Sequence, residues 1–156
     1  MKIKIDIREN QLIKLMRALN NDYGYNIEII TEKLDLGDLI ITTDKNEELL
    51  MIERKSINDL ASSIKDGRYA EQSLRLNSYN LHNHNIVYLI EGNISNWSNK
   101  YSKMKKETLY VTMFCLNYYK GFSVIKTNDI YETAEYILRF TDKMGREKHK
   151  QRFYNN

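Results

Sequence analysis

The amino-acid sequence predicts an α/β fold in which helices flank a mixed central sheet. Short apolar runs typical of strands alternate along the chain with segments whose apolar residues recur every three or four positions, as in helices. The chain of 156 residues is long enough to bury the core of one domain, which we assign to residues 1–156. Its 42% hydrophobic and 29% charged residues are typical of a globular protein.

The N-terminal part of the chain is expected to form a strand, a helix and a second strand. Isoleucines alternate with charged residues over residues 2–6, which indicates the first strand. Residues 12–19 carry leucines and a methionine at helical spacing, and Gly24 follows as a residue that ends helices. Alternating isoleucines at residues 26–31 indicate the second strand.

A β-hairpin and a capped helix come next. The apolar residues of 38–44 and 48–54 suit two strands, and the polar residues between them suit the turn of a hairpin. Ser56 is a good N-cap for a helix over about residues 56–65. Asp59, at the third helical position, would complete a capping box with Ser56.

The second half of the chain alternates helices and strands. Gly67 ends the preceding helix, and the uninterrupted apolar run at residues 86–90 is typical of a strand covered on both faces. We expect, in order, a helix over 69–81, a strand over 86–90, a polar loop over 92–106, a helix over 107–120, a strand over 122–125, and a helix from residue 129 into the basic tail.

The composition excludes several classes of protein. No apolar run approaches the length of a membrane span, and the N-terminus lacks a signal sequence, so no membrane partner is expected. The single Cys115 excludes a disulfide framework and favours a reducing intracellular compartment, nucleus or cytoplasm depending on the source. His82 and His84 have no cysteine nearby with which to form a zinc site. The net charge of +3 neither demands nor opposes a nucleic-acid partner.

Two carboxylates and a lysine are the first candidate site. Alternate residues of a strand face the same way, so Glu53 and Lys55 should project together, and the hairpin should bring Asp38 beside them. Two carboxylates near one ammonium cost free energy unless a cation binds there, and Mg²⁺ is usually held by carboxylates and substrate phosphates. The alternative is that these three side chains are solvated charges at strand ends.

Motifs around these residues resemble a known family. Residues 37–76 contain, in order, GDLII, IERKSINDL and SIKDGRYAEQSLRL. This set resembles the nuclease domain of the XPF-type structure-specific endonucleases, a branch of the PD-(D/E)XK superfamily, whose pattern is GD, ERKxxxD and SIxDGRxxEQxxRL. DIRE at residues 6–9 and YLIEG at 88–92 are similar to further segments of that family. The ExK pattern of Glu53 and Lys55 alone would be weak evidence for this family. The resemblance of the whole ordered set of motifs implies a restriction-endonuclease-like nuclease fold.

The resemblance implies a catalytic centre built on Asp38, Glu53 and Lys55. Asp38 and Glu53 would be the principal ligands of Mg²⁺, with Mn²⁺ as a substitute, while Glu9 and Asp6 are candidate further ligands, directly or through water. Lys55 would orient or help to deprotonate the attacking water and offset charge on the phosphate.

Residues around this centre are expected to contact DNA or to support the ligands. Arg54 should point away from Glu53 and pair with Asp59, which would make both supporting residues. The aromatic and lysine residues of 97–106 suit contact with single strands. The candidate DNA contacts are Arg8, Lys65, Arg68, Gln72 and Arg75, and solvated surface charge is the alternative for each of them.

The function that follows is a Mg²⁺-dependent DNA endonuclease of DNA repair or recombination, acting on branched, flap or fork structures, a preference that comes from the family alone. Two alternatives remain at this stage: a non-catalytic DNA-binding subunit of a heterodimeric nuclease, and another PD-(D/E)XK enzyme such as a junction resolvase. Residues 1–156 hold no helix-hairpin-helix module, which many family members carry, so specificity for a DNA structure is in doubt.

A homodimer is expected for two reasons. Apolar residues cover nearly the whole circumference of the helix at 107–120, and a helix that is apolar all round is buried on every side. A small domain with one sheet does not provide that burial alone. The resemblance also implies dimerisation through the nuclease domain.

Overall fold

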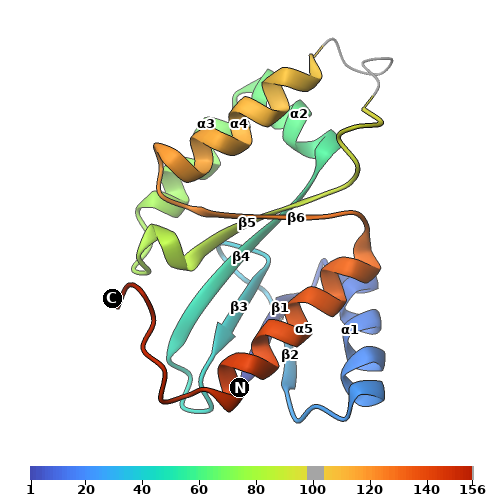
Figure 1. Cartoon of the computed structure of the whole chain (residues 1–156), viewed down its shortest axis with the longest axis vertical. Coiled ribbons are helices and arrows are strands. Elements are labelled where there is room, and N and C mark those ends of the chain that lie inside the picture. The colour runs from blue at the N-terminus through green and yellow to red at the C-terminus, as the bar shows by residue number, and fades with distance from the viewer. Residues whose placement is uncertain (98–103, 156) are drawn as a thin grey trace.

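The computed structural model describes residues 1–97 and 104–155. The chain forms the predicted α/β fold, with one six-stranded mixed sheet in the order β2-β1-β3-β4-β5-β6. The elements are β1 (Lys2–Asp6), α1 (Asn10–Tyr23), β2 (Glu28–Glu32), β3 (Leu39–Thr42), β4 (Glu48–Ser56), α2 (Ile57–Asp66), α3 (Arg68–Asn77), η1 (Asn83–Asn85), β5 (Ile86–Glu91), α4 (Lys106–Tyr118), β6 (Ser123–Thr127) and α5 (Ile130–Arg146) (Figure 1).

The sheet combines a hairpin with parallel strands. β3 pairs antiparallel with β1 and with β4, as the hairpin predicts. β4, β5 and β6 are parallel neighbours, and β1 pairs parallel with β2. The carboxyl ends of β4, β5 and β6 therefore point in the same direction and lie side by side at one end of the strands.

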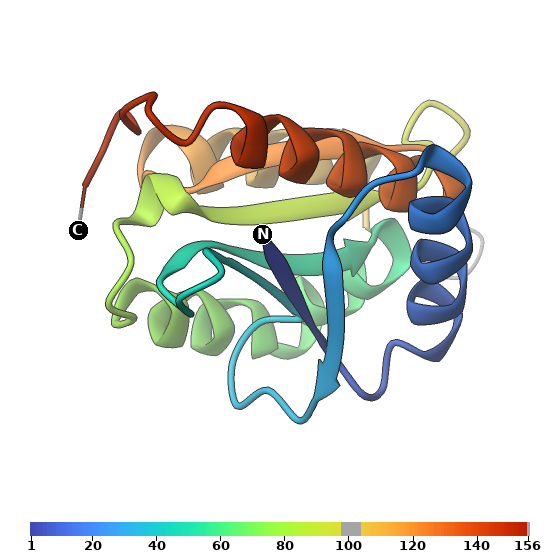
Figure 2. The same cartoon turned by 90° about the horizontal axis from the view of Figure 1, so that it is seen from below.

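Helices cover both faces of the sheet (Figures 1 and 2). One core lies between the sheet and the helices α2, α3 and α4, with Leu60, Leu76 and Leu116 among its buried residues. The other core lies between the sheet and the helices α1 and α5, and includes Met16 and Ile137. Because β4 and β5 lie between two cores, both faces of these strands are buried, which explains the continuous apolar run predicted for β5.

Local signals set the ends of the helices around the hairpin. The Ser56 hydroxyl accepts a hydrogen bond from the Asp59 amide at 3.1 Å, which confirms Ser56 as the N-cap of α2. Gly67, at a φ of 84°, separates α2 from α3 in the left-handed conformation that glycine adopts without strain. The helix predicted to reach residue 81 ends instead at Asn77. Leu81 is buried as a core residue beyond that end, so its apolar character reflects packing and not a helical position.

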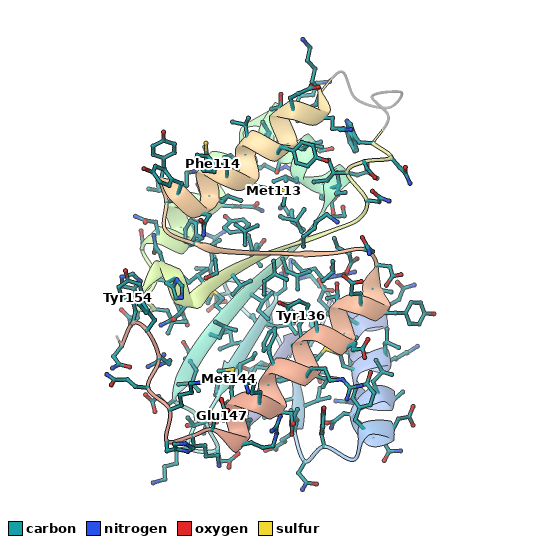
Figure 3. The ribbon with its side chains drawn as sticks, in the orientation of Figure 1. Met113, Phe114, Tyr136, Met144, Glu147 and Tyr154 are labelled. Carbon is teal, nitrogen blue, oxygen red and sulfur yellow. The ribbon has the colours of Figure 1, made fainter. Side chains whose placement is uncertain are left out.

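Helix α4 is only partly covered by its own chain. Leu109 and Leu116 alone are fully buried among its described side chains, so the burial on every side that its apolar residues predict would need a second chain and stays a prediction. Aromatic and aliphatic side chains stand exposed on its outer side (Figure 3). We call them the α4 patch: Tyr110, Val111, Phe114, Tyr118 and Tyr119. Within this patch the Phe114 and Tyr118 rings stack at 5.1 Å between their centroids.

The loop before α4 was expected to contact single-stranded DNA. Lys100, Tyr101 and Lys103 lie outside the described residues, whereas Lys105 and Lys106 lie at the start of α4. Trp97 packs against the first core, and its indole N–H donates to the Met104 carbonyl at 3.1 Å. The indole is therefore held against the core, and contact of this segment with single-stranded DNA stays a prediction. In the described part of the chain, no helix has the length and apolarity needed to cross a bilayer.

A steric test of the hairpin follows from Gly37, which has a φ of 76° and lies against Met51. A Cβ there would approach the Met51 Cγ atom to 2.7 Å, inside a packed core. We expect Gly37→Ala to lower the free energy of unfolding by about 2–4 kcal/mol, since overpacking adds to the cost of a positive φ. Gly24→Ala is the control, because Gly24 has a φ of 69° and no atom within 4 Å of its Cβ position. Equal losses in chemical denaturation for the two variants would contradict this prediction.

Candidate active site

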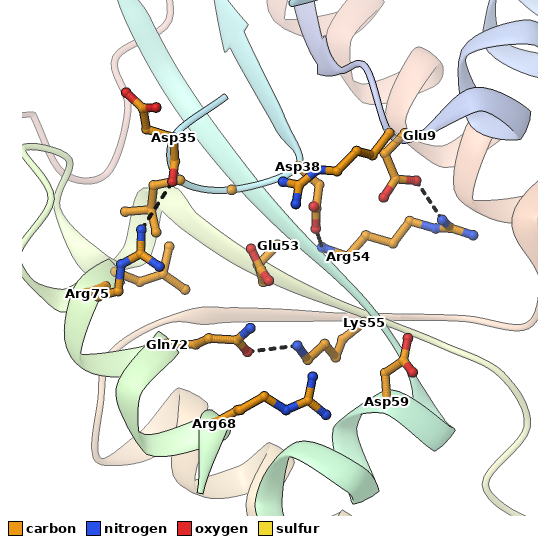
Figure 4. Close-up of a pocket in the computed structure, with 14 residues that line it drawn as sticks. Glu9, Asp35, Asp38, Glu53, Arg54, Lys55, Asp59, Arg68, Gln72 and Arg75 are labelled. Carbon is orange, nitrogen blue, oxygen red and sulfur yellow. Dashed lines mark hydrogen bonds and ion pairs between the residues drawn. The ribbon is translucent and has the colours of Figure 1, made fainter. Parts of the chain in front are cut away.

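The hairpin of β3 and β4 brings the predicted trio together. The Asp38 amide donates to the Ile52 carbonyl at 2.8 Å, which sets Asp38 beside the end of β4. Glu53 and Lys55 alternate along β4, so both face the same side of the sheet. Asp38, Glu53 and Lys55 all line one cavity of about 490 Å³ (Figure 4).

The two carboxylates are held in an environment that favours their neutral forms. Burial raises the pKa of Asp38 to about 6, although the Arg54 amide donates to the Asp38 Oδ2 atom at 2.7 Å and opposes this. Burial raises the pKa of Glu53 to about 8, and the charge of Asp38 adds to that rise. Neighbouring like charges removed from water are the condition under which a cation binds most favourably.

Lys55 is oriented by a neutral group. Only 8% of Lys55 is exposed, and its Nζ atom donates to the Gln72 Oε1 atom at 2.7 Å. Gln72 comes from α3, so this helix fixes the direction of the lysine head group into the cavity (Figure 4). Gln72, which was expected to contact DNA, lines the cavity and bonds to the lysine, and its contact with DNA stays a prediction.

Asp6 and Arg8 form a hydrogen-bonded pair that differs from the expectation for Asp6. The Asp6 side chain is 1% exposed, and both of its oxygens are occupied by the Arg8 side chain and by the amides of Arg8 and Leu34. The hydrogen bond from the Arg8 guanidinium lowers the pKa of Asp6 to about 2. Asp6 is not in the cavity lining, so its geometry argues against the expected role as a metal ligand. Arg8 does line the cavity and keeps a side chain that is 77% exposed.

Arg54 also departs from its expected partner. Its guanidinium contacts the Glu9 carboxylate at 2.7 Å and the Glu91 carboxylate at 2.6 Å, in place of the predicted pairing with Asp59. Glu9 lines the cavity beside Asp38, while Asp59 lines it from α2. Glu91 was missed from the sequence. The available signal was a carboxylate at the end of a strand that is otherwise buried, where a charge needs a partner.

Basic residues stand around the opening. Arg68 and Arg75, on α3, both line the cavity. Arg68 forms an exposed ion pair with Asp66 at 2.8 Å, and Arg75 donates to the Asp35 carbonyl at 3.2 Å. Lys65 is exposed and does not line the cavity. Of the predicted DNA contacts, the structure therefore gathers Arg8, Arg68 and Arg75 around the trio and leaves Lys65 apart.

The donor set fits a hard divalent cation. Among the described residues, no three side chains of His, Cys, Asp or Glu form a ready-made metal cage. Two partly buried carboxylates suit Mg²⁺, which is usually held by one or two carboxylates, several waters and substrate phosphates. Asp38 and Glu53 would be those carboxylates, and Glu9 lines the same cavity.

Comparison with known proteins gives concordant matches. The profile of the ERCC4 domain family matches residues 5–140. The chain is 37% identical over 139 residues to "Probable crossover junction endonuclease mus81" of Dictyostelium discoideum, covering 78% of this chain and 15% of that protein. It is 33% identical over 127 residues to "Structure-specific endonuclease subunit MUS81" of Homo sapiens, covering 73% of this chain and 22% of that protein. The chain thus spans less than a quarter of the length of these relatives.

Solved structures resemble the chain in fold. XPF from Aeropyrum pernix superposes with a TM-score of 0.74 at 23% identity, over 100% of this chain and 67% of that one. The same protein in complex with DNA superposes with a TM-score of 0.70, over 99% of this chain and 68% of that one. This likeness confirms the predicted nuclease-type fold.

The raised pKa values predict how a divalent ion stabilises the protein. The folded chain keeps protons on Asp38 and Glu53 to about pH 6 and pH 8, whereas the unfolded chain loses them near pH 4, so stability without metal falls as the pH rises through this window. An ion bound to the carboxylates offsets that loss. We expect Mg²⁺ to raise Tm by several degrees at about pH 8 and by much less at about pH 5.

Thermal unfolding with and without Mg²⁺ measures this difference. In Glu53→Gln the gain at high pH should largely disappear, because one of the two repelling charges is gone. A wild-type gain that is the same at both pH values would rule out these carboxylates as the metal site.

Proposed function

This chain belongs to the ERCC4 domain family, and from that membership we propose that it is a metal-dependent DNA endonuclease that hydrolyses phosphodiester bonds at branched, flap or fork DNA. The observation that carries the proposal is the convergence of Asp38, Glu53 and Lys55 in one polar cavity ringed by arginines. We propose that residues 1–156 form its nuclease domain. The single free Cys115 favours a reducing intracellular compartment.

The roles of the trio follow from their surroundings. Asp38 and Glu53 would hold Mg²⁺ or Mn²⁺, which when bound activates a water and neutralises the phosphate. The Arg54 amide holds the Asp38 carboxylate in place. Lys55, directed by Gln72, offers an ammonium to the phosphate and to the attacking water, because no hydrogen-bonded carboxylate among the described residues neutralises it.

DNA recognition would rest on the arginines of the cavity opening. Arg8, Arg68 and Arg75 carry positive charge to the rim, where phosphates on either side of the cut could be contacted. The relatives are named as crossover junction and structure-specific endonucleases, which supports a branched substrate. Phosphate contacts alone do not select a branch, so the selecting elements would lie outside this cavity.

We propose further that the chain acts as a homodimer through the α4 patch. Contiguous exposed aromatic residues on a small protein mark a surface that is covered by a partner. A relative named as a subunit supports assembly with another chain.

Cleavage assays on labelled flap, fork, four-way and linear DNA test the catalytic proposal. Asp38→Asn and Glu53→Gln should abolish cutting, because each removes a ligand charge from the metal site. Lys55→Ala should lower kcat by about 10²-fold or more, the usual loss when electrostatic or acid–base help is removed. DNA binding should survive all three changes, since the arginines that contact phosphate are untouched. Glu28→Gln, on the edge strand β2, is the matched control.

Full cleavage by Glu53→Gln, or cleavage by the wild type in excess chelator, would contradict the assignment of a metal-dependent nuclease site to Asp38, Glu53 and Lys55. A wild type that binds branched DNA without cutting it, alone and with Mg²⁺, would instead favour the non-catalytic subunit.

Light scattering at micromolar concentration tests the dimer. We expect a mass of twice the 18.6 kDa chain. Phe114→Glu should give the single-chain mass, because a charge in the centre of an apolar interface is left without a partner. Phe153→Glu, at another exposed aromatic position, in the C-terminal tail, should leave the mass unchanged. A single-chain mass for the wild type would overturn the dimer.

A further inference from the structure

A partly buried polar network lies behind the cavity and reaches a helix on the other side of the sheet. At its centre is the Arg54 guanidinium, which makes two parallel hydrogen bonds to Glu91: Nε to Oε1 at 3.1 Å and Nη2 to Oε2 at 2.6 Å. The remaining terminal nitrogen, Nη1, donates to the Glu9 Oε2 atom at 2.7 Å. Arg54 thus holds one carboxylate with a two-point grip and a second with a single bond.

Thr133 holds Glu91 from the far side, and Thr127 in turn contacts Thr133. The Thr133 hydroxyl, in the first turn of α5, donates to the Glu91 Oε1 atom at 2.5 Å. The Thr127 hydroxyl, at the end of β6, lies 2.7 Å from that of Thr133. Both threonines are fully buried, so these hydroxyls have no water to replace the bonds they make.

This network acts on the cavity at two points. Arg54 contributes its amide to Asp38 and its guanidinium to Glu9, and both of those carboxylates line the cavity. Among the described residues, the other oxygen of Glu9 has no protein hydrogen bond and can accept from a water. If Glu91 were released, Arg54 could turn further toward Glu9 or toward the metal site, and its charge would oppose a divalent ion.

We propose that Glu91 and Thr133 are positioning residues of the active site. They fix the Arg54 guanidinium so that Glu9 keeps its place in the cavity wall and so that the positive charge of Arg54 stays neutralised away from the metal. This inference rests on the proposed function and extends the site from the β3–β4 hairpin to helix α5. Neither residue touches the cavity, so each acts only through Arg54.

Changes at Thr133 separate positioning from packing. Thr133→Val keeps the shape of the side chain and removes the hydroxyl, while Thr133→Ser keeps the hydroxyl and should restore wild-type behaviour. Thr141→Val is the matched control: Thr141 is fully buried on the same helix, and its hydroxyl has no partner among the described residues. Glu91→Gln is a second variant that keeps the size and one acceptor and removes the charge.

Mn²⁺ binding by calorimetry, kcat and KM for a flap substrate, and Tm are measured for each protein. We expect Thr133→Val and Glu91→Gln to weaken Mn²⁺ binding and to lower kcat, each by about 10-fold, the usual effect of losing a residue that orients a metal ligand. KM for DNA should stay unchanged, because the arginines at the rim are not altered. Thr133→Ser and Thr141→Val should match the wild type within about twofold.

The outcomes distinguish the two proposals. If Thr133→Val and Glu91→Gln lower Tm but leave Mn²⁺ affinity and kcat unchanged, the network is structural and the inference is overturned. A wild type that binds Mn²⁺ but does not cleave removes the nuclease function, and the inference is then decided by Mn²⁺ affinity alone. A wild type that neither binds Mn²⁺ nor cleaves overturns both.

Discussion

The burial of Asp38 and Glu53 beside each other is the constraint on which the rest of the site depends. Both carboxyl groups have raised pKa values chiefly because burial disfavours their charged forms, and the charge of Asp38 adds to the rise in the pKa of Glu53. The fold must therefore hold the two carboxylates in place, and it does so with hydrogen bonds to backbone groups. The Asp38 amide and carboxylate bond to Ile52 and Arg54 of the neighbouring strand. A rigid hairpin keeps the two charges together until a cation offsets their repulsion.

Strand alternation gives the two adjacent cations different tasks. Lys55 faces the cavity side of β4 and bonds to a neutral amide, so its charge remains available to a phosphate. Arg54 faces the other way, where a planar guanidinium can bond to two carboxylates at once. If position 54 carried a lysine and position 55 an arginine, neither side chain could do the task of the residue it replaced. A lysine cannot form the two-point bond to Glu91, and an arginine would fill the space beside the carboxylates.

Local patterns in the sequence predicted the elements and the hairpin, because alternation and turn chemistry act over a few residues. The same patterns brought Asp38, Glu53 and Lys55 together correctly. Partners far apart in sequence were not predictable in this way. Arg54 was paired with Asp59, five residues on, whereas its partners lie 45 and 37 residues away in the chain. The helix predicted to reach Leu81 was wrong for a related reason, since the apolar character of a residue does not say which surface will cover it.

The parallel arrangement of β4, β5 and β6 explains why the site and its supporting network lie together at the carboxyl ends of these strands. β4, β5 and β6 run in the same direction, so Lys55, Glu91 and Thr127 come at or near the carboxyl ends of three neighbouring strands. Side chains there are not needed to fill the cores and can be polar. The N-terminal turn of α5 adds Thr133 to this edge. A chain of hydrogen bonds can therefore run from strand end to strand end, and it links the cavity to a helix that packs on the opposite face of the sheet.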